Sequence, residues 1–91
     1  MANKVTRELT VINKLGIHAR PAALFVKVAA KFESSILVEK DGETINGKSI
    51  MGLMMLAAAQ GSKLMITAEG RDAEAALKAL EELFLQKFNE D

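Results

Sequence analysis

The sequence predicts a two-layer α+β domain, in which helices cover one face of a sheet. Some segments alternate apolar and polar residues as half-buried strands do, and the segments between them repeat apolar residues at helical spacing. The pair Asp41–Gly42 separates two of the alternating segments and is typical of a two-residue hairpin turn. Half-polar strands beside amphipathic helices imply a sheet with one covered face and one open face.

The chain begins with a predicted strand, a turn and an amphipathic helix. Residues Val5 to Ile12 alternate in polarity, although Arg7 interrupts the apolar face near the edge. A turn follows at residues 13–16, and from Ala19 to about Phe32 apolar residues recur at helical spacing. Pro21 stands in the first turn of this helix, where its missing N–H costs nothing and its fixed φ favours helix entry.

A hairpin from Ile36 to Asn46 provides the second and third predicted strands. Its two-residue turn sets the register, so that Lys40 lies opposite Glu43 and Val38 lies opposite Ile45. A charge pair and an apolar pair therefore fall on the same ladder, which supports this assignment.

The second half of the chain predicts helix, strand and helix. Ser49 is placed to cap a helix from Ile50 to about Gln60, with Gly61 as a left-handed stop. Leu64 to Ala68 alternate as a fourth strand, and Asp72 is the predicted N-cap of the last helix. The order is thus β-α-β-β-α-β-α. The buried stripe of the last helix is predicted to consist of Ala73, Leu77, Leu80, Phe84 and Phe88.

Length and composition exclude several classes of function. The 91 residues suffice for one domain, residues 1–91, and the twelve Lys and Arg residues balance twelve Asp and Glu residues. We therefore expect neither nucleic-acid nor membrane binding. One histidine without cysteines cannot build a structural zinc site, so we expect no metal and no cofactor. The N-terminus lacks the apolar core of a signal peptide, which favours a cytoplasmic location.

His18, the only histidine, stands directly before the first predicted helix. The opening N–H groups of a helix lack helical acceptors, and the helix dipole is positive there, so this position suits a phosphate. Arg20 adds a fixed cation, and Gly16 permits a sharp turn that exposes the ring. A ring nitrogen of His18 could therefore accept a phosphoryl group. The alternative is that His18 only caps the helix; this chemistry also leaves open which nitrogen reacts.

The segment Leu15 to Ala23 closely resembles the active-site motif of the HPr family, the histidine-containing phosphocarriers of the bacterial phosphotransferase system. In this motif Gly16, Ala19 and Pro21 are supporting positions around His18. A second motif, Lys48-Ser49-Ile50-Met51-Gly52, and the order of the elements match as well, so the resemblance covers essentially the whole chain.

The resemblance implies a fold, a reaction and partners. The fold would be an open-faced sandwich with a four-stranded antiparallel sheet of order 1-4-2-3 and three helices on one face. His18 would accept a phosphoryl group on its pros nitrogen from phosphorylated enzyme I, which draws on phosphoenolpyruvate. It would pass the group to enzyme IIA proteins in sugar uptake, and Arg20 would stabilise the phosphate.

Residues Gly42 to Ser49 also match the nucleotide-binding pattern G-x-x-x-x-G-K-[ST]. That motif requires a loop that wraps the phosphates between a strand and a helix. Here the first glycine belongs to the predicted hairpin turn, and Glu43 to Asn46 are needed as a strand. The chain is also too short for a nucleotide-binding α/β sheet, so we reject this interpretation.

The predicted second helix is apolar on nearly every side, so a single layer of helices cannot bury all of it. We expect Leu53, Leu56 and Ala57 to pack inward. Flexible methionines on the remaining surface suit the docking of several partners, although a methionine-rich core helix is the alternative. In the resembling family this surface binds enzyme I and enzyme IIA beside residues of the first helix. The resulting docking patch consists of Leu24, Lys27, Ile50, Met51, Met54 and Met55.

Ser49 has both a structural and a regulatory interpretation. As an N-cap it would contribute about 1 kcal/mol. It also resembles the serine that HPr kinase/phosphorylase modifies in the family, and a phosphate there would place negative charge within the docking patch. HPr kinase/phosphorylase is thus a further expected partner, where the host contains it. Met55 departs from the small or hydroxylated residue expected there, which affects partner specificity.

Three functional classes remain open from sequence. The chain could be a carrier in sugar uptake, a regulatory relative in a nitrogen-type relay, or an interaction domain that transfers nothing. The last is disfavoured because the chain keeps His18, Arg20 and Pro21 together. Beyond His18 and Arg20 nothing offers acid–base chemistry, so we expect a monomeric stoichiometric carrier that is not an enzyme.

Overall fold

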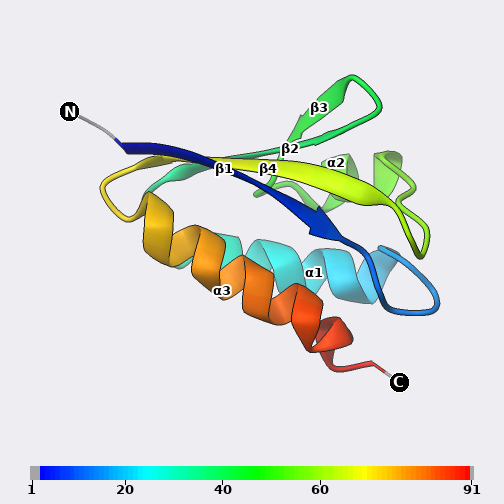
Figure 1. Cartoon of the computed structure of the whole chain (residues 1–91). Helices are drawn as coiled ribbons and strands as arrows, with labels where there is room; N and C mark the ends of the chain where they lie inside the picture. The colour runs from blue at the N-terminus through cyan, green and yellow to red at the C-terminus, as the bar shows by residue number, and fades with distance from the viewer. Residues whose placement is uncertain (1–2, 91) are drawn as a thin grey trace.

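The computed structural model describes residues 3–90, so residues 1, 2 and 91 of the predicted domain lie outside the described residues. The order of elements is the predicted β-α-β-β-α-β-α, followed by one short 3-10 turn, η1 (Figure 1). The elements are β1 (Asn3–Thr10), α1 (Ala19–Ala29), β2 (Ser35–Lys40), β3 (Glu43–Asn46), α2 (Ile50–Met55), β4 (Lys63–Gly70), α3 (Ala73–Leu85) and η1 (Lys87–Asn89).

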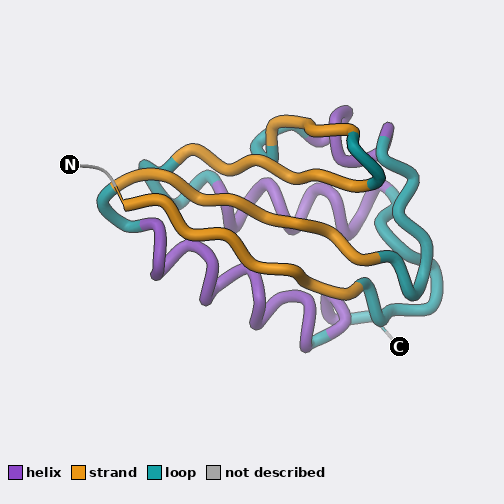
Figure 2. The backbone as a smooth tube through the Cα atoms, turned by 45° about the horizontal axis from the view of Figure 1, so that its top comes forward, coloured by secondary structure: helices purple, strands orange, loops and turns teal. Residues whose placement is uncertain are grey.

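The four strands form one antiparallel sheet in the order β1-β4-β2-β3, as predicted (Figure 2). In the hairpin, Lys40 pairs with Glu43 and Val38 pairs with Ile45, which confirms the expected register. Asp41 and Gly42 have φ of 52° and 84°, as a type I′ turn requires. Since residues 43–46 form a paired strand, the nucleotide-binding pattern has no phosphate loop here.

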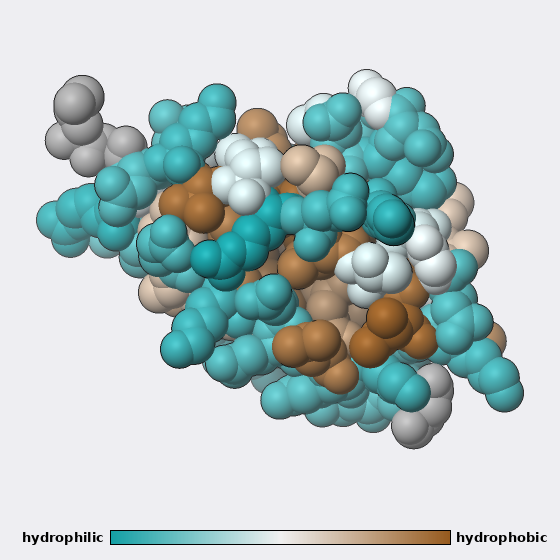
Figure 3. Space-filling model, in the orientation of Figure 1, coloured by the Kyte–Doolittle hydropathy of each residue, from teal (hydrophilic) through white to brown (hydrophobic). Residues whose placement is uncertain are grey.

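Helices α1 and α3 lie side by side below the sheet, and α2 packs against α1 and β3 (Figures 1 and 2). Hydrophilic residues cover most of the face of the molecule on which α3 lies (Figure 3). The core between the two layers contains all five residues of the predicted stripe, but Phe88 lies in η1, because α3 ends at Leu85 and the backbone has positive φ at residues 87–89. Its largest fully buried apolar side chains are Phe25, Phe88, Ile36, Leu53, Leu64, Ile66, Leu77, Leu80, Val11 and Val38.

The first strand and first helix differ from prediction at their ends. β1 begins two residues earlier, at Asn3, because β4 extends to Gly70 and provides a partner. It ends at Thr10 because the sheet ladder stops there, and Val11 pairs instead with the loop residue Ser62. α1 ends at Ala29 instead of Phe32, since the N–H groups of Lys31 and Phe32 bond three residues back, as in a 3-10 turn.

The second helix is shorter than predicted and ends at Met55 instead of Gln60. Ala57 adopts a left-handed φ of 49°, so Ala57 is exposed and Ala58 is buried. The inward position predicted for Ala57 is therefore wrong. Gly61 has a positive φ, but it lies in the turn before β4 and does not end the helix.

Asp72 is the N-cap residue of α3, as predicted, but its carboxylate does not cap the helix. Its side chain makes no capping bond to α3 and instead binds the turn between α1 and β2. The backbone N–H groups of Glu33 and Ser34 donate to its two oxygens at 2.9 and 3.0 Å, and the Ser34 hydroxyl donates as well. The Ser34 hydroxyl and the Glu33 N–H lower the pKa of the Asp72 carboxyl below its usual value of 3.8.

Arg7, which interrupts the apolar face of β1, lies beside α3. Its guanidinium is 3.3 Å from the Glu74 carboxylate and 3.6 Å from that of Glu81. The spacing of Glu74 and Lys78 predicts a pair within the helix, but Glu74 pairs with the strand instead. A charge on the covered face of the sheet is thus accommodated at the edge, where the helix provides opposite charge.

Candidate functional site

His18 occupies the N-cap position of α1, in extended backbone conformation. Its side chain makes no capping hydrogen bond to the helix, and about 40% of the side chain is exposed. Helix capping therefore does not explain why a histidine ring stands at this position. An exposed imidazole at a helix entrance is what the carrier interpretation requires.

The first turn of α1, which follows His18 directly, contains hydrogen-bond donors that the helix does not use. The first helical bond runs from the Ala22 N–H to the His18 carbonyl, at 3.0 Å. The N–H groups of Ala19 and Arg20 precede it and have no acceptor within the helix, and Pro21 has no N–H. Arg20 is exposed and pairs with no carboxylate among residues 3–90. The helix entrance thus offers backbone donors and a cation to a phosphate.

The loop before His18 is held by its glycine. Gly16 has φ of +71°, and a Cβ at this position would lie 2.9 Å from the Cα of Ala59. The N–H of Ile17 donates to the Ala58 carbonyl at 2.8 Å. Gly16 is therefore needed both for the turn and for close contact with the loop that follows α2. That contact joins the His18 loop to the loop that follows α2, the helix that contains most of the docking patch.

Glu90 is a site residue that sequence reasoning missed. Its Oε2 atom lies 2.9 Å from Nε2 of His18, and its Oε1 atom accepts from the Asn13 amide at 3.0 Å. The side chain of Glu90 is only 11% exposed. No periodicity could have indicated this contact, because Glu90 follows the last helix and is 72 residues from His18.

The docking patch is exposed along α2. Met51 and Met55 are 74% and 65% exposed, while Leu53 and Leu56 are buried as expected. In α1, Leu24 is half-buried and Lys27 is exposed. Ile50 and Met54 are exposed as well.

Leu15 is a second residue that sequence reasoning missed, since its exposure is 73%. It lies three residues before His18, within the motif itself, and its position in a turn was the available signal. A large apolar side chain exposed beside the histidine extends the apolar surface of this end of the molecule.

Ser49 caps α2 as predicted, since its hydroxyl accepts from the Gly52 N–H at 3.0 Å. Lys48, in the same motif, reaches the other end of α1, where its ammonium donates to the Phe32 carbonyl at 2.8 Å. The second motif therefore includes a residue that stabilises the fold, in addition to the cap Ser49.

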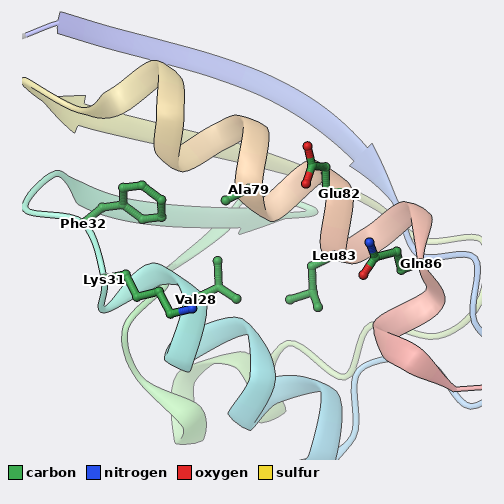
Figure 4. A pocket seen from close by; sticks show the side chains of 7 residues that line it. All are labelled: Val28, Lys31, Phe32, Ala79, Glu82, Leu83 and Gln86. Atoms are coloured by element: carbon green, nitrogen blue, oxygen red, sulfur yellow. The ribbon is translucent and has the colours of Figure 1, made fainter.

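A groove of about 290 Å³ between α1 and α3 contains none of the predicted site residues (Figure 4). Its lining side chains come from the two helices, the turn after α1 and Gln86, which follows α3 (Figure 4). Among residues 3–90 no group of His, Asp and Glu side chains could hold a metal ion. No helix in this part of the chain has the length and apolar character needed to cross a bilayer.

Comparisons with known proteins agree with this geometry. Residues 5–86 match the family model described as the PTS HPr component phosphorylation site. The phosphocarrier protein HPr of Treponema pallidum is 48% identical over 87 residues, which cover 96% of this chain and 99% of the relative.

Solved structures give the same result. A crystal structure of HPr from Thermoanaerobacter tengcongensis is 52% identical, covers 98% of both chains and has a TM-score of 0.89. A structure described as an HPr dimer from the same organism is 54% identical, with a TM-score of 0.77, and covers 90% of this chain and 94% of that one. The chain therefore belongs to the HPr family of phosphocarriers of the phosphotransferase system.

Proposed function

We propose that His18 accepts a phosphoryl group from phosphorylated enzyme I and passes it to enzyme IIA proteins in sugar uptake. The exposed His18 ring at the entrance of α1, beside Arg20, carries this proposal. The chain acts as a stoichiometric carrier in the cytoplasm and catalyses no turnover of its own. Phosphoenolpyruvate is the ultimate donor.

The described geometry supports each part of the transfer. A ring nitrogen attacks phosphorus, and the bond between phosphorus and the donor atom of enzyme I breaks. Negative charge on the phosphoryl oxygens then lies near the N–H groups of Ala19 and Arg20 and the Arg20 guanidinium. Since the site is open to solvent, a second protein can approach the loaded ring.

Incubation with enzyme I and phosphoenolpyruvate tests the proposal. We expect an acid-labile phosphate on His18, which enzyme IIA removes. His18→Gln should carry none. Label that persists in His18→Gln, or no label on the wild-type chain with active enzyme I, would contradict the proposed function.

The docking patch is proposed to bind both partners. Met51→Glu places a charge on a side chain that is 74% exposed, so it should reduce transfer from enzyme I with little change in the unfolding midpoint. Leu37→Glu, on the open face of the sheet, is the matched control because Leu37 is also exposed and pairs with the uncharged residues Thr67 and Asn46. Equal transfer kinetics for the two variants would count against the patch.

Ser49 is proposed as a regulatory site of HPr kinase/phosphorylase. Both Asp and Asn can replace Ser as an N-cap, and only Asp adds charge near the docking patch. Ser49→Asp should therefore slow phosphorylation of His18 by enzyme I, and Ser49→Asn should not. If Ser49→Asp accepts phosphate at the wild-type rate, the regulatory role is wrong.

We propose that the chain is a monomer, with one carrier site in each molecule. An HPr relative from Thermoanaerobacter tengcongensis is described as a dimer, so the point needs its own measurement. Light scattering during size-exclusion chromatography should give a mass near 9.8 kDa. A mass of twice this value would contradict the proposal.

A further inference from the structure

Both carboxylate oxygens of Glu90 accept hydrogen bonds. The Asn13 amide donates to Oε1, and Nε2 of His18 is 2.9 Å from Oε2. An ionised carboxylate can only accept, so Nε2 must carry the hydrogen in this contact. In the neutral ring the hydrogen on Nε2 leaves Nδ1 with its lone pair.

We propose that Glu90 is a positioning residue, which fixes the tautomer and orientation of the His18 ring and so keeps the lone pair on Nδ1, the pros nitrogen that the family resemblance already implies as the acceptor. This inference rests on the proposed function, because it assigns Glu90 a role in the same transfer. The logic is that of a carboxylate which orients a reactive imidazole through its other nitrogen.

The backbone before Glu90 holds this residue in place. Lys87, Phe88 and Asn89 have φ of 55°, 54° and 60°, in the left-handed region that residues other than glycine rarely adopt. Phe88 is fully buried, and its ring centroid lies 4.9 Å from that of Phe84. The Glu90 N–H also donates to the Lys87 carbonyl at 2.9 Å. A buried aromatic side chain thus stabilises an uncommon turn that directs Glu90 to the ring.

Asn13 connects Glu90 to the loop that carries the histidine. Asn13 is fully buried, and its amide nitrogen donates both to the Gly16 carbonyl at 2.8 Å and to Glu90. Its side-chain oxygen has no partner among the described residues. The loop, the C-terminal segment and the ring therefore belong to one hydrogen-bonded cluster, in which Glu90 contacts Asn13 through Oε1 and His18 through Oε2.

The cluster also has a role in the charge balance of the step. The Nδ1 lone pair forms the bond to phosphorus, while the donor–phosphorus bond breaks and its electron pair stays on the donor atom. The His18 ring then carries a positive charge, which the Glu90 carboxylate faces through the Nε2 hydrogen. No further reactant is needed.

The test uses the full chain labelled with ¹⁵N. Ring-nitrogen chemical shifts of His18 should show the Nε2–H tautomer in the wild type and a larger share of Nδ1–H in Glu90→Gln, because an amide does not fix the tautomer. The same variant should lower kcat for phosphorylation by enzyme I roughly 10- to 100-fold, with KM for the chain nearly unchanged. Glu82→Gln, an exposed residue of α3, is the matched control and should behave as wild type.

Each outcome decides a separate point. The same tautomer in wild type and Glu90→Gln, or an unchanged kcat, overturns the inference while the carrier function stands. If the wild type takes no phosphate at His18, the proposed function fails instead, and the tautomer measurement still shows whether Glu90 holds the ring. A loss of kcat shared equally by Glu82→Gln would also contradict the role of Glu90.

Discussion

Asp72 precedes α3 and Glu90 follows it, and the two ends of this helix lie at opposite ends of the domain (Figure 1). Asp72 follows β4 and binds the turn between α1 and β2, next to the end where Asn3 pairs with Gly70. Glu90 follows α3 and binds the loop between β1 and α1. Each carboxylate therefore joins segments that are distant in the sequence.

The donors at the two ends differ in kind. The Asp72 carboxylate accepts hydrogen bonds from two backbone N–H groups and a serine hydroxyl, and these bonds lower its pKa. The Glu90 carboxylate accepts hydrogen bonds from two side chains, and one of them, His18, remains 40% exposed. Backbone donors fix the fold at one end, whereas at the other end the same kind of interaction holds a reactive group that partners can reach.

Removal of the Phe88 ring should have the largest effect on stability. Phe88→Ala deletes a fully buried aromatic side chain, so the free energy of unfolding should fall by about 3–5 kcal/mol, measured by urea denaturation. In the folded variant the His18 ring shifts should resemble those of Glu90→Gln, while amide exchange of Ser34 at the other end stays slow. A loss below about 1 kcal/mol would show that this segment does not hold Glu90.

A smaller effect should follow from a methyl group at Gly16. Gly61→Ala is the reference variant, because its φ is strained but nothing lies within 4 Å of the new Cβ. It should lower the free energy of unfolding by about 1–2 kcal/mol. Gly16→Ala has the strained φ and a backbone contact, which adds about 1–3 kcal/mol. Urea denaturation of both variants measures the difference. Equal losses would mean that the loop after α2 does not restrict the His18 loop.

The smallest effect is expected at Asp72, as a change in acid dependence. Its folded-state pKa is lowered, so its contribution is present above its usual value of 3.8 and is lost as pH falls through the folded value. Asp72→Asn should be less stable at neutral pH and should lose less stability than wild type below about pH 4. Thermal unfolding between pH 2 and 7 measures this, and Ser34→Ala should show part of the same change. Parallel curves for wild type and Asp72→Asn would contradict this role.

Much of the fold follows from local patterns. The hairpin register is fixed by the chemistry of Asp41 and Gly42, and the α3 stripe by simple periodicity. His18, Pro21 and Ser49 are at the element boundaries that their residue types predict. These features depend on neighbours along the chain, which is why sequence reasoning finds them.

The errors concern contacts between distant segments. α2 ends early because its following loop docks on the His18 loop through Ala58, and no local signal marks that position. Asp72 is at its predicted N-cap position, yet its carboxylate binds the distant turn at Ser34 instead of the first turn of the helix. The Glu90 contact depends on a left-handed turn without glycine, which local propensity disfavours.

The amount of phosphate on each chain is the most direct test of the carrier function. After incubation with enzyme I and excess phosphoenolpyruvate, intact-mass analysis should show one phosphoryl group for each chain, and ³¹P NMR should place it on Nδ1 of His18. Addition of enzyme IIA should return the chain to its original mass. A chain that stays unmodified, or a phosphoryl group on another residue, would contradict the account.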